Sequence, residues 1–291
     1  MSTTFALLTL AVLALWARGW WWAGLFVASL GSALIAGVVR PIGLVWIAAF
    51  ATASWSGCER ERVVDRPLAH ARSHRHTRIG ATIAILVIAA GLMTHTLPGF
   101  ANPRVLDQMR FSADALPFRL HTNYDKALVG LFLLALCHPR LARAADWRAM
   151  LRAAAPVAGG TIVTLLGLAL AAGYVRFDPK FPPETWLFLW VNLCFTCVAE
   201  EALFRGFIQR QLTLAWAKIR HGAWFALLAA AVLFGLAHAG GGPVYVALST
   251  VAGLGYGWAY LRTGQRIEAG ILTHFALNAV HFVGFTYPAL E

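Results

Sequence analysis

Residues 186–206 read WLFLWVNLCFTCVAEEALFRG, an apolar run that ends in two glutamates and an arginine. No charged residue occurs between Trp186 and Ala199, and such a run is typical of a membrane-spanning helix, which needs about 20 predominantly apolar residues. An ionisable side chain at bilayer depth is costly unless it is paired or hydrated, and it usually marks a functional site. Glu200, Glu201 and Arg205 are therefore the first candidates for such a site.

The composition of the whole chain supports a membrane location. Of its 291 residues 59% are hydrophobic and 13% are charged, whereas a soluble domain has roughly 25% charged residues. Apolar segments cover residues 5–17, 20–39, 41–57, 79–96, 126–138, 153–174, 185–208, 223–239, 243–261 and 268–287. The sequence predicts an all-α fold, a polytopic transmembrane helical bundle of about eight to ten spans.

The net charge of +11 does not indicate a nucleic-acid partner, because most of the 24 lysines and arginines lie in short loops between apolar segments. These basic loops are 58–78, 139–152, 209–221 and 262–267, while the intervening loops 97–125 and 175–184 are poorer in basic residues. Basic loops stay in the cytoplasm. We expect an integral, multi-pass protein with both termini outside and the lipid bilayer as its surroundings.

The polar loops and the cysteines are less informative about fold and function than the apolar segments. We interpret loop 58–78 as a solvated loop near anionic lipid, and metal binding by its histidines is the alternative; these are His70, His74 and His76. The stretch 97–125 is expected to lie on the membrane surface or to cap a cavity. The four cysteines lack the spacing of a secreted scaffold, so no disulfide is expected; they are Cys58, Cys137, Cys194 and Cys197.

Helical spacing divides the roles of the two glutamates. Glu201 and Arg205 are four residues apart, so they share a helix face and can pair. Glu200 is turned about 100° away and has no partner within its own helix. Glu201 is therefore predicted to be structural, and Glu200 is the candidate general base.

Two later apolar segments carry further polar groups. His274 and Asn278 are four residues apart and present an imidazole and an amide on one stripe, a pair suited to binding an oxyanion. His238, four residues after Phe234, precedes the AGGGP sequence that must end its helix. Counting helix rise places Glu200 and His238 at depths that differ by roughly 10–15 Å. His281 is interpreted as a polar group near a helix end.

The motifs EEALFRG at residues 200–206, Phe234 with His238, and His274 with Asn278 occur in this order on successive apolar segments. This arrangement resembles the CPBP family (also called ABI), the glutamic intramembrane endopeptidases related to the CAAX prenyl protease Rce1 and to bacteriocin-processing proteins. The resemblance covers residues 185–287, about the last third of the chain. We divide the chain into an N-terminal transmembrane region, 1–125, of unassigned role and a protease core, 126–291.

The resemblance implies a role for each matching residue. Glu200 would activate water, His238 would position that water, and His274 with Asn278 would bind the oxyanion. Glu201 with Arg205, and Phe234 beneath them, would support the site. The family works without a metal or other cofactor, so none is expected here. A prokaryotic cytoplasmic membrane is the expected location, and the expected partner is a membrane-tethered protein or peptide.

The expected reaction is endoproteolysis in processing or C-terminal sorting, as by a myxosortase-like enzyme; a prenylated CAAX tail is not expected in a prokaryotic host. Three alternatives stay open. Glu200, His238 and His274 are a sufficient ligand set for zinc, although there is no HExxH motif. Cys194 or Cys197 is the candidate nucleophile of a cysteine mechanism. Buried glutamate and histidine also serve proton relays, so a transporter, an immunity protein or a non-catalytic scaffold is the third alternative.

Overall fold

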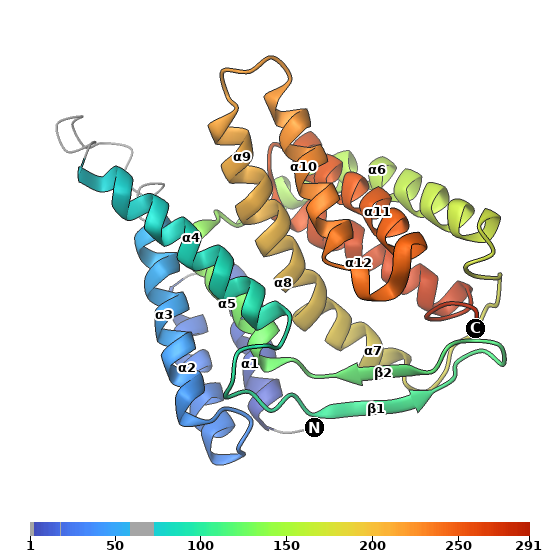
Figure 1. The fold of residues 1–291 in the computed structure, drawn as a ribbon, viewed down its shortest axis with the longest axis horizontal. Helices are drawn as coiled ribbons and strands as arrows, with labels where there is room; N and C mark the ends of the chain where they lie inside the picture. The colour runs from blue at the N-terminus through green and yellow to red at the C-terminus, as the bar shows by residue number, and fades with distance from the viewer. Residues whose placement is uncertain (1–2, 18, 59–72) are drawn as a thin grey trace. The chain divides into compact units, whose positions relative to one another are not determined.

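The computed structural model describes residues 3–17, 19–58 and 73–291 (Figure 1). A helix coincides with each of the ten predicted apolar segments, which confirms the helical bundle. The elements are α1 (Thr3–Leu13), η1 (Ala14–Trp16), α2 (Trp21–Ile35), α3 (Pro41–Cys58), α4 (Ser73–Met93), β1 (Arg104–Met109), β2 (Phe118–His121), α5 (Tyr124–Cys137), α6 (Ala144–Ala171), α7 (Thr185–Val191), η4 (Asn192–Cys197), α8 (Val198–Glu201), η5 (Ala202–Gln209), α9 (Arg210–Ala215), α10 (Gly222–Leu236), η6 (Ala239–Gly241), α11 (Gly242–Arg262) and α12 (Ile267–Gly284).

Among the described residues, four helices are long and apolar enough to cross a membrane. They comprise Pro41–Cys58, Ala144–Ala171, Thr185–Ala215 and Ala239–Arg262. The described residues also form four shorter apolar helices of 10–17 residues. Apolar side chains such as Val163 and Trp186 are exposed, as expected of a surface that faces lipid, whereas α5 and helix Thr185–Ala215 are mostly buried.

The chain divides into two compact units. The first comprises the chain up to Pro103 together with Thr122–Arg140, and the second comprises Arg104–His121 and Leu141–Glu291. In the first unit α5 packs against α1, α3 and α4. Its core includes Phe132, whose ring lies 5.2 Å from that of Phe26 and 6.3 Å from that of Phe50.

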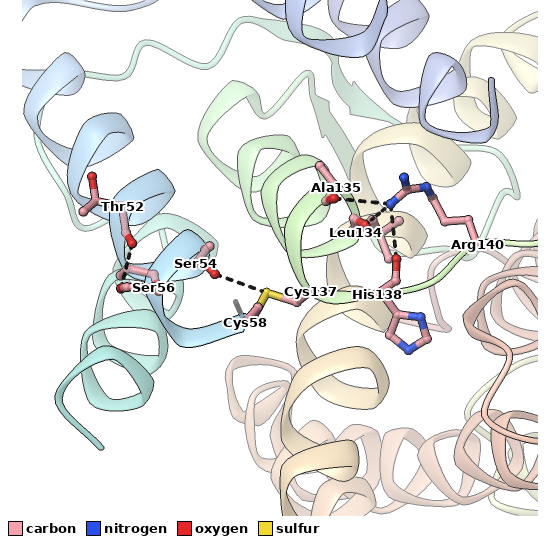
Figure 2. The surroundings of a disulfide bond; sticks show 10 residues. Thr52, Ser54, Ser56, Cys58, Leu134, Ala135, Cys137, His138 and Arg140 are labelled. Carbon is pink, nitrogen blue, oxygen red and sulfur yellow. Dashed lines mark hydrogen bonds between the residues drawn. A yellow bond between two sulfur atoms is a disulfide. The ribbon is translucent and has the colours of Figure 1, made fainter. Parts of the chain in front are cut away.

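A disulfide joins Cys58, the last residue of α3, to Cys137, the last residue of α5 (Figure 2). The expectation of no disulfide was wrong for this pair, because packing of α3 on α5 brings two ends that are 79 residues apart to a Cα–Cα distance of 5.0 Å. Arg140 follows and donates hydrogen bonds to the carbonyls of Leu134, Ala135 and His138 (Figure 2).

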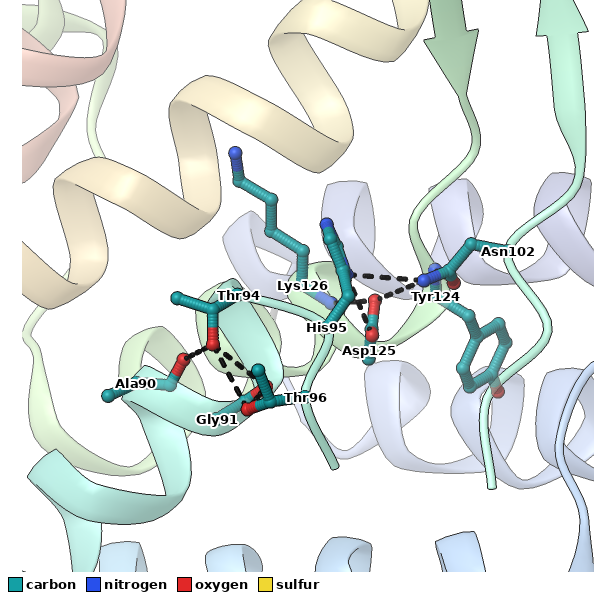
Figure 3. Close-up of polar contacts among 9 residues, drawn as sticks. All are labelled: Ala90, Gly91, Thr94, His95, Thr96, Asn102, Tyr124, Asp125 and Lys126. Atoms are coloured by element: carbon teal, nitrogen blue, oxygen red, sulfur yellow. Dashed lines mark hydrogen bonds and ion pairs between the residues drawn. The ribbon is translucent and has the colours of Figure 1, made fainter. Parts of the chain in front are cut away.

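A polar cluster fixes the start of α5 (Figure 3). The buried Asp125 carboxylate accepts hydrogen bonds from Asn102 at 2.9 Å and from His95 Nδ1 at 2.8 Å. The side-chain oxygen of Asn102, Oδ1, accepts from the Tyr124 backbone N–H at 2.9 Å. Because Asp125 lies in the first turn, its charge also favours the helix N-terminus. The histidines of loop 58–78 lie outside the described side chains.

In the second unit α11 packs against α6, α10 and α12, and α12 also packs against α6. The sequence did not predict its antiparallel hairpin of β1 and β2. Aromatic packing holds the hairpin: the Phe118 ring lies 6.1 Å from Phe188 of α7 and 5.0 Å from Tyr287. Arg110 of the hairpin loop donates to Glu291 at 2.7 Å, and this hydrogen bond and charge lower the pKa of the Glu291 carboxyl.

Candidate active site

The polar residues of the EEALFRG motif lie on one continuous helix, Thr185–Ala215, of 31 residues. At 1.5 Å per residue it is about 46 Å long, more than the roughly 30 Å hydrocarbon core. Its α-helical turn α8 carries Glu200 and Glu201 between two π-helical segments, η4 and η5. π-Helical turns are rare and frequently occur at functional sites.

Glu201 is the centre of a buried ionic network. Its Oε1 lies 2.9 Å from Arg205 Nη1 and 2.9 Å from His274 Nδ1, and both the glutamate and the arginine are fully buried. Because a carboxylate only accepts hydrogen bonds, His274 Nδ1 carries a proton in this arrangement. The predicted pairing of Glu201 with Arg205 is present, and His274 of α12 joins it.

Glycines on the neighbouring helices make room for this network. Arg205 Nη2 donates to the Gly253 carbonyl of α11 at 3.0 Å. A Cβ atom at Gly253 would lie 3.2 Å from Arg205 Nη2, and one at Gly270 of α12 would lie 2.8 Å from Glu201 Oε2. Bare backbone at these positions of α11 and α12 therefore leaves room for the two charged side chains.

The Arg205 guanidinium also lies over aromatic rings. Its central carbon is 4.5 Å from the ring centre of Phe234 and 5.1 Å from that of Tyr256. Cation–π contact is strongest where water is excluded. Tyr256 stacks on the imidazole of His274 with ring centres 4.4 Å apart and an angle of 14° between the planes. The rings thus fix both partners of Glu201.

Glu200 has different surroundings. The side chain is 7% exposed, and Oε2 lies 3.8 Å from His274 Nε2. The imidazole of His274 therefore has Glu201 at one nitrogen and Glu200 near the other, an arrangement that couples the two glutamates.

His238 follows the end of α10. Its Nδ1 donates to the Phe234 carbonyl at 2.7 Å, which leaves Nε2 as the other functional nitrogen. The ring lies 4.6 Å from Phe234 and 5.4 Å from Tyr245. Since Phe234 also contacts His274 at 5.8 Å, His238 reaches the same aromatic cluster as His274.

The depth difference predicted between Glu200 and His238 is absent. Helix Thr185–Ala215 continues past residue 208 before α10 begins, so α10 starts further along the long helix than was counted. Phe204 of the long helix and Phe234 of α10 therefore meet, with ring centres 5.1 Å apart. Phe204 is three residues beyond Glu201, and Phe234 is four residues before His238. The glutamate and histidine motifs are therefore adjacent.

Asn278 lies one turn beyond His274 on α12, as the spacing predicts. Its Nδ2 donates to Asn192 Oδ1 at 3.3 Å, and Cys197 Sγ donates to the same oxygen at 3.2 Å. His281 is placed differently, since its Nε2 lies 3.1 Å from the carbonyl oxygen of Thr286 beyond the end of α12.

The sequence prediction missed several residues that line this site. They are Asn192, Tyr245 and Tyr256, together with the glycines at positions 253 and 270. None of these residue types is unusual in an apolar segment, so only the contacts identify them. Within residues 3–17, 19–58 and 73–291, no group of three or more histidine, cysteine or acidic side chains is arranged to hold a metal ion.

Residues 182–280 match a family model described as Rce1-like, type II CAAX prenyl endopeptidase Rce1-like. The matched range includes every residue of the predicted site. Comparisons with curated proteins and with solved structures found no match. The family match supports the CPBP resemblance and indicates a membrane protease of the CAAX type. With its apolar helices, the chain is an integral, multi-pass membrane protein.

Proposed function

We propose that this protein is an intramembrane endopeptidase in which Glu200 activates a water molecule against a peptide bond of a membrane-tethered substrate. The observation that carries the proposal is the placement of Glu200 3.8 Å from the imidazole of His274, whose other nitrogen contacts Glu201, the partner of Arg205. Glu200 and His274 are both buried, and exclusion of bulk water strengthens the electrostatic interactions of a general base.

The two histidines have separate roles in this proposal. His238 donates Nδ1–H to the Phe234 carbonyl, so its Nε2 accepts a hydrogen bond from the attacking water. Glu200 takes the proton of that water as the new carbon–oxygen bond forms, and later transfers it to the leaving amine. The peptide bond breaks in this second step, and the glutamate returns to its starting state.

His274 and Asn278 are the proposed oxyanion site. A protonated His274 donates to Glu201 through Nδ1, which leaves Nε2–H to donate to the tetrahedral intermediate. Once Glu200 has taken the proton, the negative charges of Glu201 and of the oxyanion match the positive charges of this imidazolium and of Arg205. The Asn278 amide supplies a second N–H donor from the next turn of α12.

The expected substrates carry their own transmembrane segment, because the site lies among apolar helices. A C-terminal sorting signal or a bacteriocin leader in a prokaryotic cytoplasmic membrane has these properties, so we propose a processing or sorting role of the myxosortase-like kind. The proposed mechanism uses no metal or other cofactor.

Co-expression with candidate membrane-tethered substrates, followed by intact-mass analysis, tests the proposed function. A cut made by the wild type but not by Glu200→Gln is the expected result and identifies the scissile bond. Equal masses in both strains for every candidate would favour a transporter or scaffold.

The same assay separates the mechanisms. Loss of cleavage with a strong chelator, restored by zinc, would favour zinc catalysis. Loss of cleavage in Cys194→Ala, with Glu200→Gln active, would favour a thiol.

A further inference from the structure

Asn192 has no role of its own in the proposed reaction, but it is hydrogen bonded to Asn278, a proposed oxyanion donor. It lies in η4, two turns before Glu200, and is 8% exposed. Its Oδ1 accepts from Asn278 Nδ2 at 3.3 Å and from Cys197 Sγ at 3.2 Å. Two donors from two helical segments therefore converge on one amide oxygen, which fixes the Asn192 side chain with its oxygen toward α12.

The π-helical geometry of η4 makes this convergence possible. Asn192 and Cys197 are five residues apart, and in an α-helix their side chains would point about 140° away from each other. The wider turn of a π-helix brings residues five apart over one another. Counting α-helical faces along the sequence separates the two residues, although their side chains are hydrogen bonded.

We infer that Asn192 is a positioning residue that orients the Asn278 amide, an inference that rests on the proposed function. An amide nitrogen has two hydrogens. One of those on Asn278 points toward Asn192 Oδ1 at 3.3 Å and toward Cys197 Sγ at 3.9 Å, two atoms that are themselves 3.2 Å apart. The other hydrogen is left for the oxyanion of the substrate. Preorganised donors stabilise an oxyanion because they need not reorient during the reaction.

Without the acceptor of Asn192 the Asn278 amide turns about its last side-chain bond, which has broad, roughly two-fold preferences. The turned amide presents its carbonyl oxygen in place of its nitrogen. A carbonyl oxygen repels the developing negative charge, so orientation affects the transition state more than it affects substrate binding.

Two substitutions at position 192 separate orientation from packing. Asn192→Leu keeps the branched shape and removes the acceptor, whereas Asn192→Asp keeps acceptor oxygens at the same place. On the substrate found by co-expression, Asn192→Leu is expected to lower kcat about tenfold with little change in KM, because it disorders one oxyanion donor. Asn192→Asp is expected to recover most of the loss. Thr196→Val, a polar deletion in the same segment, is the matched control for packing.

A double-mutant cycle then tests whether Asn192 acts through Asn278. In the Asn278→Ala background, Asn192→Leu is expected to cause no further loss of kcat. Additive losses, a change in KM alone, or failure of Asn192→Asp to recover activity in folded protein would overturn the inference and leave the proposed function standing. A folded wild type that cleaves no candidate would overturn the proposed function itself, and this inference with it.

Discussion

Glu200 and Glu201 are adjacent in sequence, but their side chains leave the helix about 100° apart and meet different surroundings. Glu201 is fully buried and lies 2.9 Å from both Arg205 and His274. Glu200 lies beside the second nitrogen of the same imidazole at 3.8 Å. Helix geometry alone predicted the pairing of Glu201 with Arg205, whereas the contribution of His274 needed the fold.

Gly270 is the residue whose side chain would most directly disturb this arrangement. A Cβ atom there would lie 2.8 Å from Glu201 Oε2, so Gly270→Ala must displace the carboxylate. We expect a loss of about 1–3 kcal/mol in the free energy of unfolding, measured by denaturation in detergent.

Gly284→Ala on the same helix is the control, because nothing lies within 4 Å of its added Cβ. Equal stability of the two variants would show that the Glu201 carboxylate is not confined as described.

Among the elements, helix Thr185–Ala215 and helix α11 form the support of the site. Arg205 and Gln209 lie one turn apart and donate to the carbonyls of Gly253 and Gly257, which are also one turn apart. Small residues let helix backbones approach closely in membranes, and interhelical hydrogen bonds add to the packing.

Removing Arg205 leaves Glu201 with one fewer partner in a fully buried position. We expect Arg205→Ala to lower the free energy of unfolding by about 3–5 kcal/mol, the cost of breaking a buried ion pair from one side. Arg262→Ala, which removes an exposed side chain of α11 whose Nε donates to the Ala153 carbonyl at 3.3 Å, is expected to cost about 0.5 kcal/mol or less. Similar thermal denaturation of both variants in detergent would contradict a structural role for Arg205.

The sequence predicted elements better than it predicted their local irregularities. Long apolar runs determine where helices form, and all ten predicted segments are helical. The sequence did not predict the π-helical turns η4 and η5, both of which pack against α12. The β1–β2 hairpin was missed because its strands have six and four residues and interactions with Phe188 and Tyr287 hold it.

At the scale of the whole molecule, all residues of the proposed chemistry belong to the unit that contains Leu141–Glu291. The other unit has its own core and its own covalent link between Cys58 and Cys137. A link that closes a 79-residue separation is expected to stabilise the folded unit by about 4 kcal/mol, chiefly through the unfolded chain.

The disulfide can be tested by alkylation of protein purified without reductant. After denaturation two cysteines are expected to react, Cys194 and Cys197, and all four after reduction, as counted by intact mass. The count is informative because the predicted topology places the basic loop 58–78, which begins at Cys58, in the cytoplasm, where disulfides are rare. Reaction of four cysteines before reduction would contradict the link between α3 and α5.

The separate roles of the two glutamates are the central claim, and one paired measurement tests it most directly. Glu200→Gln and Glu201→Gln are compared for cleavage of a membrane-tethered substrate per amount of folded protein, and for thermal stability in detergent. Glu200→Gln is expected to fold normally and to lose activity on the order of 10³-fold, as loss of a general base requires. Glu201→Gln is expected mainly to lose stability. A stable, inactive Glu201→Gln beside an active Glu200→Gln would contradict the account.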